Sequence, residues 1–111
     1  RLVQKMPPEA IAAKILEVTG GNRTYLSFDI DFLDPSCAPG TGTPIVGGPN
    51  TTAALEIVGL LGGLDLVGMD LVEVAPDYDV AEITALAGAS IMYQVLHLLA
   101  RDRPVAPGLA G

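Results

Sequence analysis

The chain has 111 residues, which is enough for one ordinary domain with a single core but too few for two. Its formal net charge is −7 with only 6 Lys and Arg, so it lacks the basic surface needed to bind nucleic acid. Half of the residues are hydrophobic, which indicates buried elements or surfaces that contact further protein. The single cysteine, Cys37, excludes an intrachain disulfide and fits a reducing compartment, so we expect a cytoplasmic location.

The first predicted element is a helix that begins at Pro7-Pro8-Glu9, where proline suits the first turn and an acid lies near the positive helix end. Its apolar residues are Ala10, Ile11, Ile15 and Val18, and Gly20-Gly21-Asn22 is expected to end it. A strand is predicted over residues 24–30, followed by a proline-rich loop over residues 31–50. Loops of this length inside compact domains usually carry function.

A second helix follows, which Asn50 or Thr52 can cap and Gly62-Gly63 is expected to end. Residues 64–74 are nearly all apolar and predict a central strand buried on both faces. A second loop covers residues 75–80.

The final predicted helix covers residues 81–100 and has no charged residue from 83 onward. That uncharged stretch reaches the lower limit for a membrane span. Scattered polar residues and the absence of a flanking basic cluster favour a helix packed on the sheet or in a subunit interface. Residues 101–111 are rich in Pro, Gly and Ala and are expected to form a flexible tail.

Strands separated by single helices indicate an α/β fold, with a parallel sheet and flanking helices. In such sheets ligands bind beyond the carboxyl ends of the strands. Asp29 and Asp31 end the first predicted strand, and Glu73 ends the second. We therefore expect these three acids to share one site.

The spacing of Asp29 and Asp31 predicts a metal site. Alternate residues of an extended chain share a face, so the two acids are expected in one row with Ser27. The opposite, core-facing row consists of Leu26, Phe28 and Ile30. Converging carboxylates repel unless one is protonated or a cation lies between them, and oxygen ligands suit Mg, Ca or Mn. An isolated Asp-x-Asp is more often a pair of solvent-facing acids at a strand end.

Two longer blocks surround these acids. The first is Ser27-Phe-Asp-Ile-Asp-Phe-Leu-Asp-Pro35, continued by Ala38-Pro-Gly-Thr-Gly-Thr-Pro44 and Gly47-Gly48. The second is Gly68-Met-Asp-Leu-Val-Glu-Val-Ala-Pro-Asp-Tyr-Asp79, continued by Glu82-Ile-Thr-Ala-Leu-Ala87. Together they resemble the signature of the ureohydrolases, the arginase and agmatinase family, and the resemblance extends from about Thr24 to Ala100.

The resemblance implies that residues 1–111 are the C-terminal part of an arginase-like three-layer α/β domain with a binuclear Mn²⁺ site. Asp29 and Asp31 match the two aspartates that share the metal pair, which activates the attacking water. Glu73 matches the catalytic and substrate-binding acid, whose paired oxygens suit a guanidinium group. Thr43 matches a loop threonine that lines the substrate site.

The family takes its other metal ligands, including histidines, from segments that precede these blocks. The only histidine here, His97, matches no family ligand and is expected to be packed or interfacial. We therefore expect the 111 residues alone to be inactive and a longer chain to complete the site. Asp34 is expected to brace the loop through backbone amides, and Asp70 to be a hydrogen-bonded buried acid.

The second block looks more like agmatinases than arginases. This implies hydrolysis of agmatine to putrescine and urea, a step of polyamine biosynthesis, by a homo-oligomer without nucleic-acid or membrane partners. Guanidinobutyrase, guanidinopropionase and arginase remain alternatives, as does a non-catalytic α/β binding or assembly module. A haloacid-dehalogenase-like phosphatase does not fit, because Phe32-Leu33-Asp34 follows the acids where that family has Thr or Val.

Overall fold

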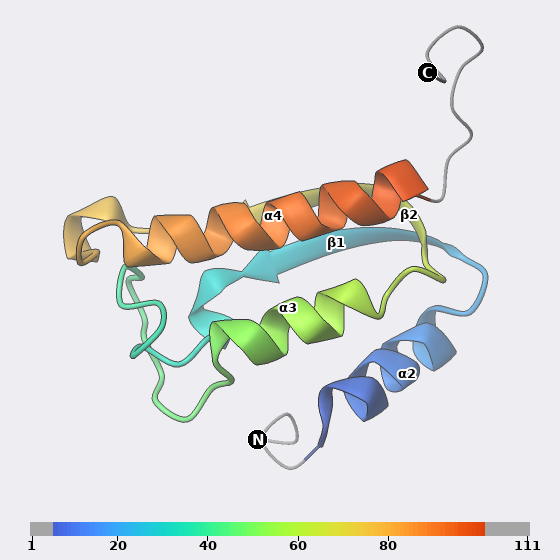
Figure 1. Cartoon of the computed structure of the whole chain (residues 1–111), viewed down its shortest axis with the longest axis horizontal. Coiled ribbons are helices and arrows are strands. Elements are labelled where there is room, and N and C mark those ends of the chain that lie inside the picture. The colour runs from blue at the N-terminus through green and yellow to red at the C-terminus, as the bar shows by residue number, and fades with distance from the viewer. Residues whose placement is uncertain (1–5, 102–111) are drawn as a thin grey trace, which may run out of the picture.

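The computed structural model describes residues 6–101 as an α/β unit. Its elements are α2 (Pro8–Thr19), β1 (Arg23–Asp29), the 3-10 turn η1 (Ile30–Phe32), α3 (Thr51–Gly59), β2 (Asp65–Val72), the 3-10 turn η2 (Pro76–Tyr78) and α4 (Ile83–Arg101). In Figure 1, α4 lies along the two strands, α3 lies beside α4, and α2 lies beyond α3. The predicted order of helices and strands is confirmed, while the predicted tail beyond Arg101 lies outside the described residues.

The ends of α2 follow the proline and glycine rules. Pro8 occupies the first helical position, where its fixed φ suits the helix and its missing N–H would have had no partner. Gly20 follows the helix with φ 57°, a conformation that glycine adopts without a Cβ clash. The Gly20 N–H donates to the Leu16 carbonyl at 3.0 Å, which closes the helix.

Asn50, rather than Thr52, caps α3. Its side-chain oxygen accepts a hydrogen bond from the Ala53 N–H at 2.8 Å. The helix ends at Gly59, earlier than the predicted end at Gly62-Gly63. The Leu60 N–H is shared between the Glu56 and Ile57 carbonyls, at 3.2 and 3.1 Å, which tightens the last turn and stops the helix.

The two strands are parallel and paired from Arg23↔Asp65 to Asp29↔Val72. Near the start the register slips, because Thr24 pairs with Leu66 and Tyr25 with Gly68. Val67 is therefore an extra residue on β2, as in a β-bulge. After it the pairing is regular, so the carboxyl ends of both strands lie side by side.

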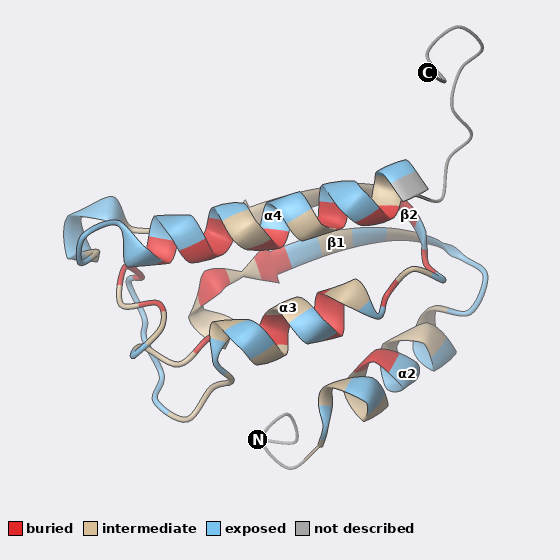
Figure 2. Cartoon of the chain, viewed as in Figure 1, coloured by how far each residue is buried: buried red, intermediate tan, exposed pale blue. Residues whose placement is uncertain are grey.

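The core lies on one face of this two-stranded sheet. Phe28 of β1 and Leu66 of β2 belong to the same buried cluster as residues of α3 and α4. Figure 2 shows that the buried positions of α4 form a stripe along the side of the helix that faces α3 and the strands. The prediction that residues 64–74 are buried on both faces is wrong for the described residues, since Val67 is 54% and Val72 38% exposed. No described element covers that second face.

Helix α4 has one buried and one exposed apolar face. Its buried positions recur every three or four residues, as expected of a helix packed along one side: Thr84, Ala87, Gly88, Ile91, Val95 and Leu98. On the opposite side Leu86, Tyr93 and Leu96 are exposed by 69%, 64% and 56%. The helix is long and apolar enough to cross a membrane, and here 33% of residues 83–100 are buried, with α4 packed on α3 and β2.

Candidate active site

Asp29 turns the chain at the end of β1. Its Oδ1 accepts a hydrogen bond from the Asp31 N–H at 3.0 Å, which caps the 3-10 turn η1. The prediction that Asp29 and Asp31 share one extended row is therefore wrong, because the strand stops at Asp29 and Asp31 lies in the turn. The core row was predicted correctly at Phe28 and Ile30, which are 8% and 0% exposed. Both acids are half-buried at the carboxyl edge of the sheet.

Thr43 returns to the same edge from the far part of the loop. Its hydroxyl donates a hydrogen bond to Asp31 Oδ2 at 3.2 Å, across a separation of 12 residues. The loop thus brings the candidate substrate-site threonine onto a candidate metal-binding acid. Asp29 and Asp31 are also joined, so three of the four predicted site residues form one hydrogen-bonded chain.

Glu73 lies at the end of the neighbouring strand. It directly follows Val72, which pairs with Asp29, and paired strands lie about 4.8 Å apart. Its side chain is exposed, and its φ of 72° falls in the left-handed region that non-glycine residues rarely adopt. Glu73 is therefore brought to the same sheet edge as the two aspartates, in an unusual backbone conformation.

Asp34 braces the loop after β1, as predicted. Its carboxylate accepts hydrogen bonds from the Ser36 hydroxyl, the Ser36 N–H at 3.0 Å and the Gly47 N–H at 2.8 Å. The Asp34 N–H donates to the Pro49 carbonyl at 2.9 Å, which closes the base of the loop. The Ser36 hydroxyl, followed by the Gly47 amide, lowers the pKa of Asp34 below its ordinary value of 3.8. Both ends of the loop are therefore held by one charged residue.

Asp70 is hydrogen-bonded as predicted, but it is half-buried rather than buried. Ser27 and Tyr25 on β1 donate to its two carboxylate oxygens, at 2.5 and 3.2 Å. Loss of hydration, and then the bond to Asp70, raises the pKa of Tyr25 above its ordinary value of 10.0. A Cβ at Gly68 would lie 3.0 Å from the Tyr25 ring, so glycine makes room for the ring beside Asp70. Asp70 thus ties the two strands together and is not positioned as a catalytic group.

Gly40 and Thr84, which the sequence pattern does not single out, join the loop after β1 to the segment after β2. The Gly40 N–H donates to the Thr84 hydroxyl, and Thr84 in turn is hydrogen-bonded to Asp79. An Asp shortly before a helix is a capping signal, so the role of Asp79 was detectable. The partner of Thr84 lies 44 residues earlier, and no local pattern predicts such a contact.

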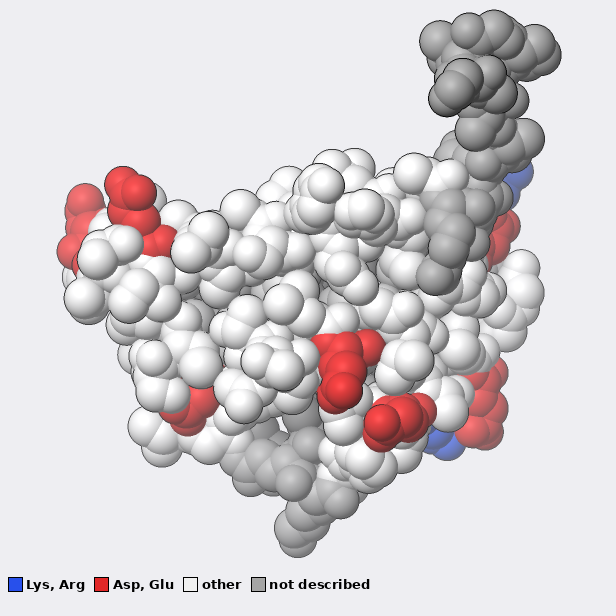
Figure 3. Space-filling view, in the orientation of Figure 1, with Lys and Arg blue, Asp and Glu red and all other residues white. Residues whose placement is uncertain are grey.

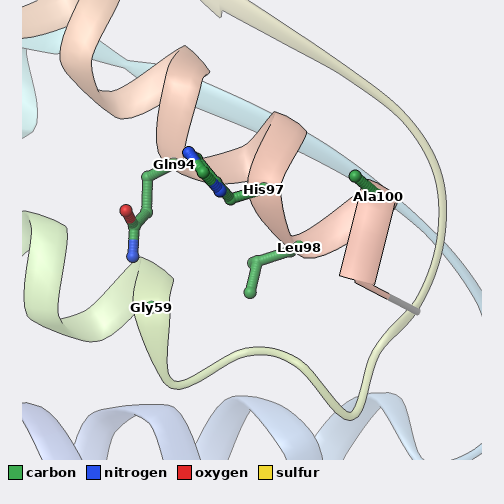
Figure 4. A pocket seen from close by; sticks show the side chains of 5 residues that line it. All are labelled: Gly59, Gln94, His97, Leu98 and Ala100. Atoms are coloured by element: carbon green, nitrogen blue, oxygen red, sulfur yellow. The ribbon is translucent and has the colours of Figure 1, made fainter. Parts of the chain in front are cut away.

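His97 lies away from this edge, in an open hollow of about 590 Å³ between α3 and α4. Figure 4 shows Gln94 extending from α4 toward Gly59, with His97 beside it. The His97 ring packs edge-on against Tyr93, with ring centroids 4.6 Å apart, and the lining residues include no acid. These surroundings do not provide a metal-binding set.

The donor chemistry at the sheet edge fits part of a metal site. Asp29 and Asp31 offer carboxylate oxygens, the ligands that Mn²⁺ and Mg²⁺ favour. Within residues 6–101, however, no group of three or more His, Cys, Asp or Glu side chains is arranged to hold an ion. Figure 3 shows the acids of one face scattered in small groups over a mostly uncharged surface. The two aspartates therefore supply an incomplete ligand set.

Comparison with known proteins decides the family. The model of the arginase family matches residues 1–98. This chain belongs to the arginase family. The predicted resemblance to ureohydrolases is thereby confirmed.

Among relatives of this arginase-family chain, an agmatinase of Neisseria meningitidis serogroup C is 57% identical over 90 residues, which cover 81% of this chain and 29% of that protein. A hypothetical agmatinase from Burkholderia thailandensis has 48% identity and a TM-score of 0.87, over 89% of this chain and 31% of its own. Formiminoglutamase from Trypanosoma cruzi, solved with Mn²⁺, has 27% identity and a TM-score of 0.78, over 92% of this chain and 35% of its own. The predicted arginase-like fold is confirmed, and the chain spans about a third or less of each relative.

Proposed function

We propose that this arginase-family chain belongs to a manganese-dependent ureohydrolase that hydrolyses agmatine to putrescine and urea. One observation carries the proposal: Asp29, Asp31 and Thr43 form a hydrogen-bonded chain at the strand edge where Glu73 also lies. The 57% identity to an agmatinase supports agmatine over other guanidino compounds as substrate. Putrescine as product would give the enzyme a place in polyamine biosynthesis.

Each site residue then has a distinct role. Asp29 and Asp31 would hold the manganese pair through their carboxylates, and Thr43, which donates to Asp31, would orient that carboxylate and line the substrate site. Glu73 binds the guanidinium through paired charge-assisted hydrogen bonds and fixes the orientation of the carbon to be attacked. Bound manganese would supply an activated water as the nucleophile. Hydrolysis breaks the bond between the guanidino carbon and the alkyl-bearing nitrogen, which leaves as the amine while urea forms.

We also propose that the remaining metal ligands come from polypeptide outside this chain, of which residues 1–111 form the C-terminal part. The incomplete ligand set within the described residues supports this. It follows that the 111-residue chain alone releases no urea. The exposed apolar side of α4, with Leu86, Tyr93 and Leu96, supports contact with further protein, including a homo-oligomer. We place the enzyme in the cytoplasm, with a small guanidino substrate as its partner.

The test is urea release by the complete reading frame that encodes this chain, purified with Mn²⁺ and supplied with agmatine, arginine or guanidinobutyrate. We expect agmatine to be preferred and the 111-residue chain to show only background. A preference for another guanidino compound would correct the substrate, and no hydrolysis of any of them would overturn the proposal.

Variants of the complete protein separate the roles. Asp31→Ala is expected to lose manganese and more than about a hundredfold in activity, a larger loss than supporting residues give. Glu73→Ala should keep its manganese and raise the KM about tenfold to a hundredfold, since bonds to charged groups are the stronger ones. Asp65→Ala is the control, because Asp65 is exposed at the start of β2, the opposite end of the strand. Equal loss of metal in the Asp31 and Glu73 variants would make Glu73 a metal ligand.

A further inference from the structure

Gly40 is the point at which the loop after β1 touches the segment after β2. Its N–H donates to the Thr84 hydroxyl at 2.7 Å, and its carbonyl accepts the Ala75 N–H at 2.7 Å. A Cβ at Gly40 would lie only 2.8 Å from the side chain of Asp79 and 3.0 Å from the Thr84 hydroxyl oxygen. Glycine is therefore needed for this close approach.

Thr84 anchors this contact from the first turn of α4. The residue is completely buried, and Asp79 accepts hydrogen bonds from the backbone amides of Thr84 at 2.9 Å and Ala85 at 3.1 Å. The Thr84 hydroxyl accepts the hydrogen bond from the Gly40 N–H. Valine has nearly the same shape but would leave the buried Gly40 N–H without a partner.

The Gly40 contact bears directly on Glu73. On one side of Glu73, Val72 pairs with Asp29 in the sheet. On the other side, Ala75 lies two residues after Glu73 and is bonded to Gly40. Glu73 is thus held between two fixed points while its own φ is 72°. Such a conformation in a non-glycine residue persists only when its surroundings restrain it. Loosening the Ala75 end would let the backbone at Glu73 relax toward commoner angles and move its carboxylate.

We propose that Thr84 is a positioning residue for substrate binding: through Gly40 and Ala75, it fixes the backbone that presents Glu73 at the site of Asp29 and Asp31. The proposal rests on the function proposed above for Glu73. Thr84 itself is completely buried, and its hydrogen bonds among the described residues go to Gly40 and Asp79, not to Asp29 or Asp31. Its influence should therefore appear in substrate affinity and not in metal content.

The first experiment compares Thr84→Val and Thr84→Ser in the complete protein, loaded with Mn²⁺ and assayed with agmatine. We expect Thr84→Val to raise the KM about tenfold, the cost of one lost hydrogen bond, with kcat within about twofold and manganese content unchanged. Thr84→Ser keeps the hydroxyl and should restore the wild-type KM. Ser90→Ala is the matched control, because among the described residues the Ser90 hydroxyl bonds within α4, to the Leu86 carbonyl.

Hydrogen exchange provides a readout that needs no activity. In Thr84→Val, the amides of Gly40 and Ala75 should exchange at least about tenfold faster, while the amides of β1 and β2 keep their protection. If the wild-type protein hydrolyses no guanidino compound, the proposed function fails, whereas the exchange result still reports on the Gly40 contact. Faster exchange with an unchanged KM would overturn the positioning role, as would loss of manganese in step with kcat.

A second variant covers the case in which Thr84→Val does not fold. Asp79→Asn keeps the shape of the side chain but weakens the acceptor that holds Thr84. It should raise the KM in the same direction, by a smaller factor than Thr84→Val. A folded Asp79→Asn protein with the wild-type KM and unchanged exchange at Ala75 would contradict the proposal.

Discussion

The connections after β1 and after β2 both lead into the candidate site, yet they are held in different ways. The loop at residues 33–50 is fixed by its own side chains: Asp34 bonds to Ser36 and Gly47, and Asn50 caps the helix that follows. The segment from Glu73 to Ala75 has no such brace among the described side-chain hydrogen bonds. It is held by the Gly40 carbonyl, which belongs to the other loop.

The difference shows that the conformation of the second connection depends on the first. Residues 33–50 are held by the bonds of Asp34 and Asn50 and by a long-range bond, from the Gly40 N–H to the Thr84 hydroxyl. Residues 73–75 take their shape from that loop, and three residues of the second connection have positive φ: Glu73, Ala81 and Glu82. Damage to the Asp34 bonds of the first connection should therefore spread to the second, whereas loss of the Thr84 bond should reach Gly40 but leave the Asp34 bonds in place.

The largest effect is expected from Gly48→Ala in the first connection. A Cβ there would lie 2.3 Å from the Phe32 carbonyl oxygen and 2.9 Å from the Asp34 nitrogen, both backbone atoms that cannot move aside. We expect a loss of about 3 kcal/mol or more in the free energy of unfolding, measured by urea denaturation of the complete protein. Gly42→Ala is the control, because its Cβ would meet nothing within 4 Å. Equal stability of the two variants would contradict this account of the loop.

Gly40→Ala tests the contact between the two connections. The added Cβ would meet Asp79 Cβ and Cγ at 2.8 Å, a less severe overlap than the 2.3 Å approach at Gly48. The expected loss is therefore smaller, about 1–2 kcal/mol in the same denaturation assay. Exchange of the Ala75 amide should rise, while the Gly47 amide, bound to Asp34, stays protected. Simultaneous loss of protection at both amides would show that the two connections are not separable.

Asn50→Ala should cost about 1 kcal/mol in the free energy of unfolding, the usual value of a lost helix cap. The variant removes the acceptor of the Ala53 N–H at the end of the first connection. Asn50→Asp keeps an acceptor oxygen and should retain most of the stability. A loss in Asn50→Asp as large as in Asn50→Ala would mean that the cap is not the reason for the asparagine.

The smallest effect is the pH dependence that Asp34 and Asp79 contribute, one in each connection. Hydrogen bonds from Ser36 and Gly47 lower the pKa of Asp34. Loss of hydration raises the pKa of Asp79, but the hydrogen bonds from Thr84, Ala85 and Val80 lower it by more, so the pKa of Asp79 is also below its ordinary value.

The lowered pKa values of Asp34 and Asp79 determine how stability changes with pH. A carboxyl whose pKa is lower in the folded state stabilises the fold above its unfolded value and loses that contribution as the pH falls through its folded pKa. Asp34→Asn should therefore lower the melting temperature at neutral pH, and its deficit should shrink below pH 3.8, the ordinary value. A deficit that stays constant with pH would show that the charge of Asp34 is not involved.

Much of the fold was predictable because it depends on local patterns. The two strands, the three helices and the core row at Phe28 and Ile30 follow from hydrophobic spacing and from proline and glycine punctuation. The placement of Asp29, Asp31 and Glu73 at one edge of the sheet followed from the rule for parallel sheets. The predicted burial of residues 64–74 on both faces was wrong. An apolar run shows that a strand can be buried, but it does not show whether helices or strands are present to cover each face.

The amino-acid sequence by itself determined the family, the order of the elements and the identity of the acids at the sheet edge. Only the tertiary structure decided that Asp31 leaves the strand to meet Thr43, and that Gly40 reaches Thr84 beside a strained Glu73. The physical reason is the separation along the sequence, because helix and strand patterns repeat within a few residues. A hydrogen bond between residues 44 apart exists only after β1, β2 and α4 have packed.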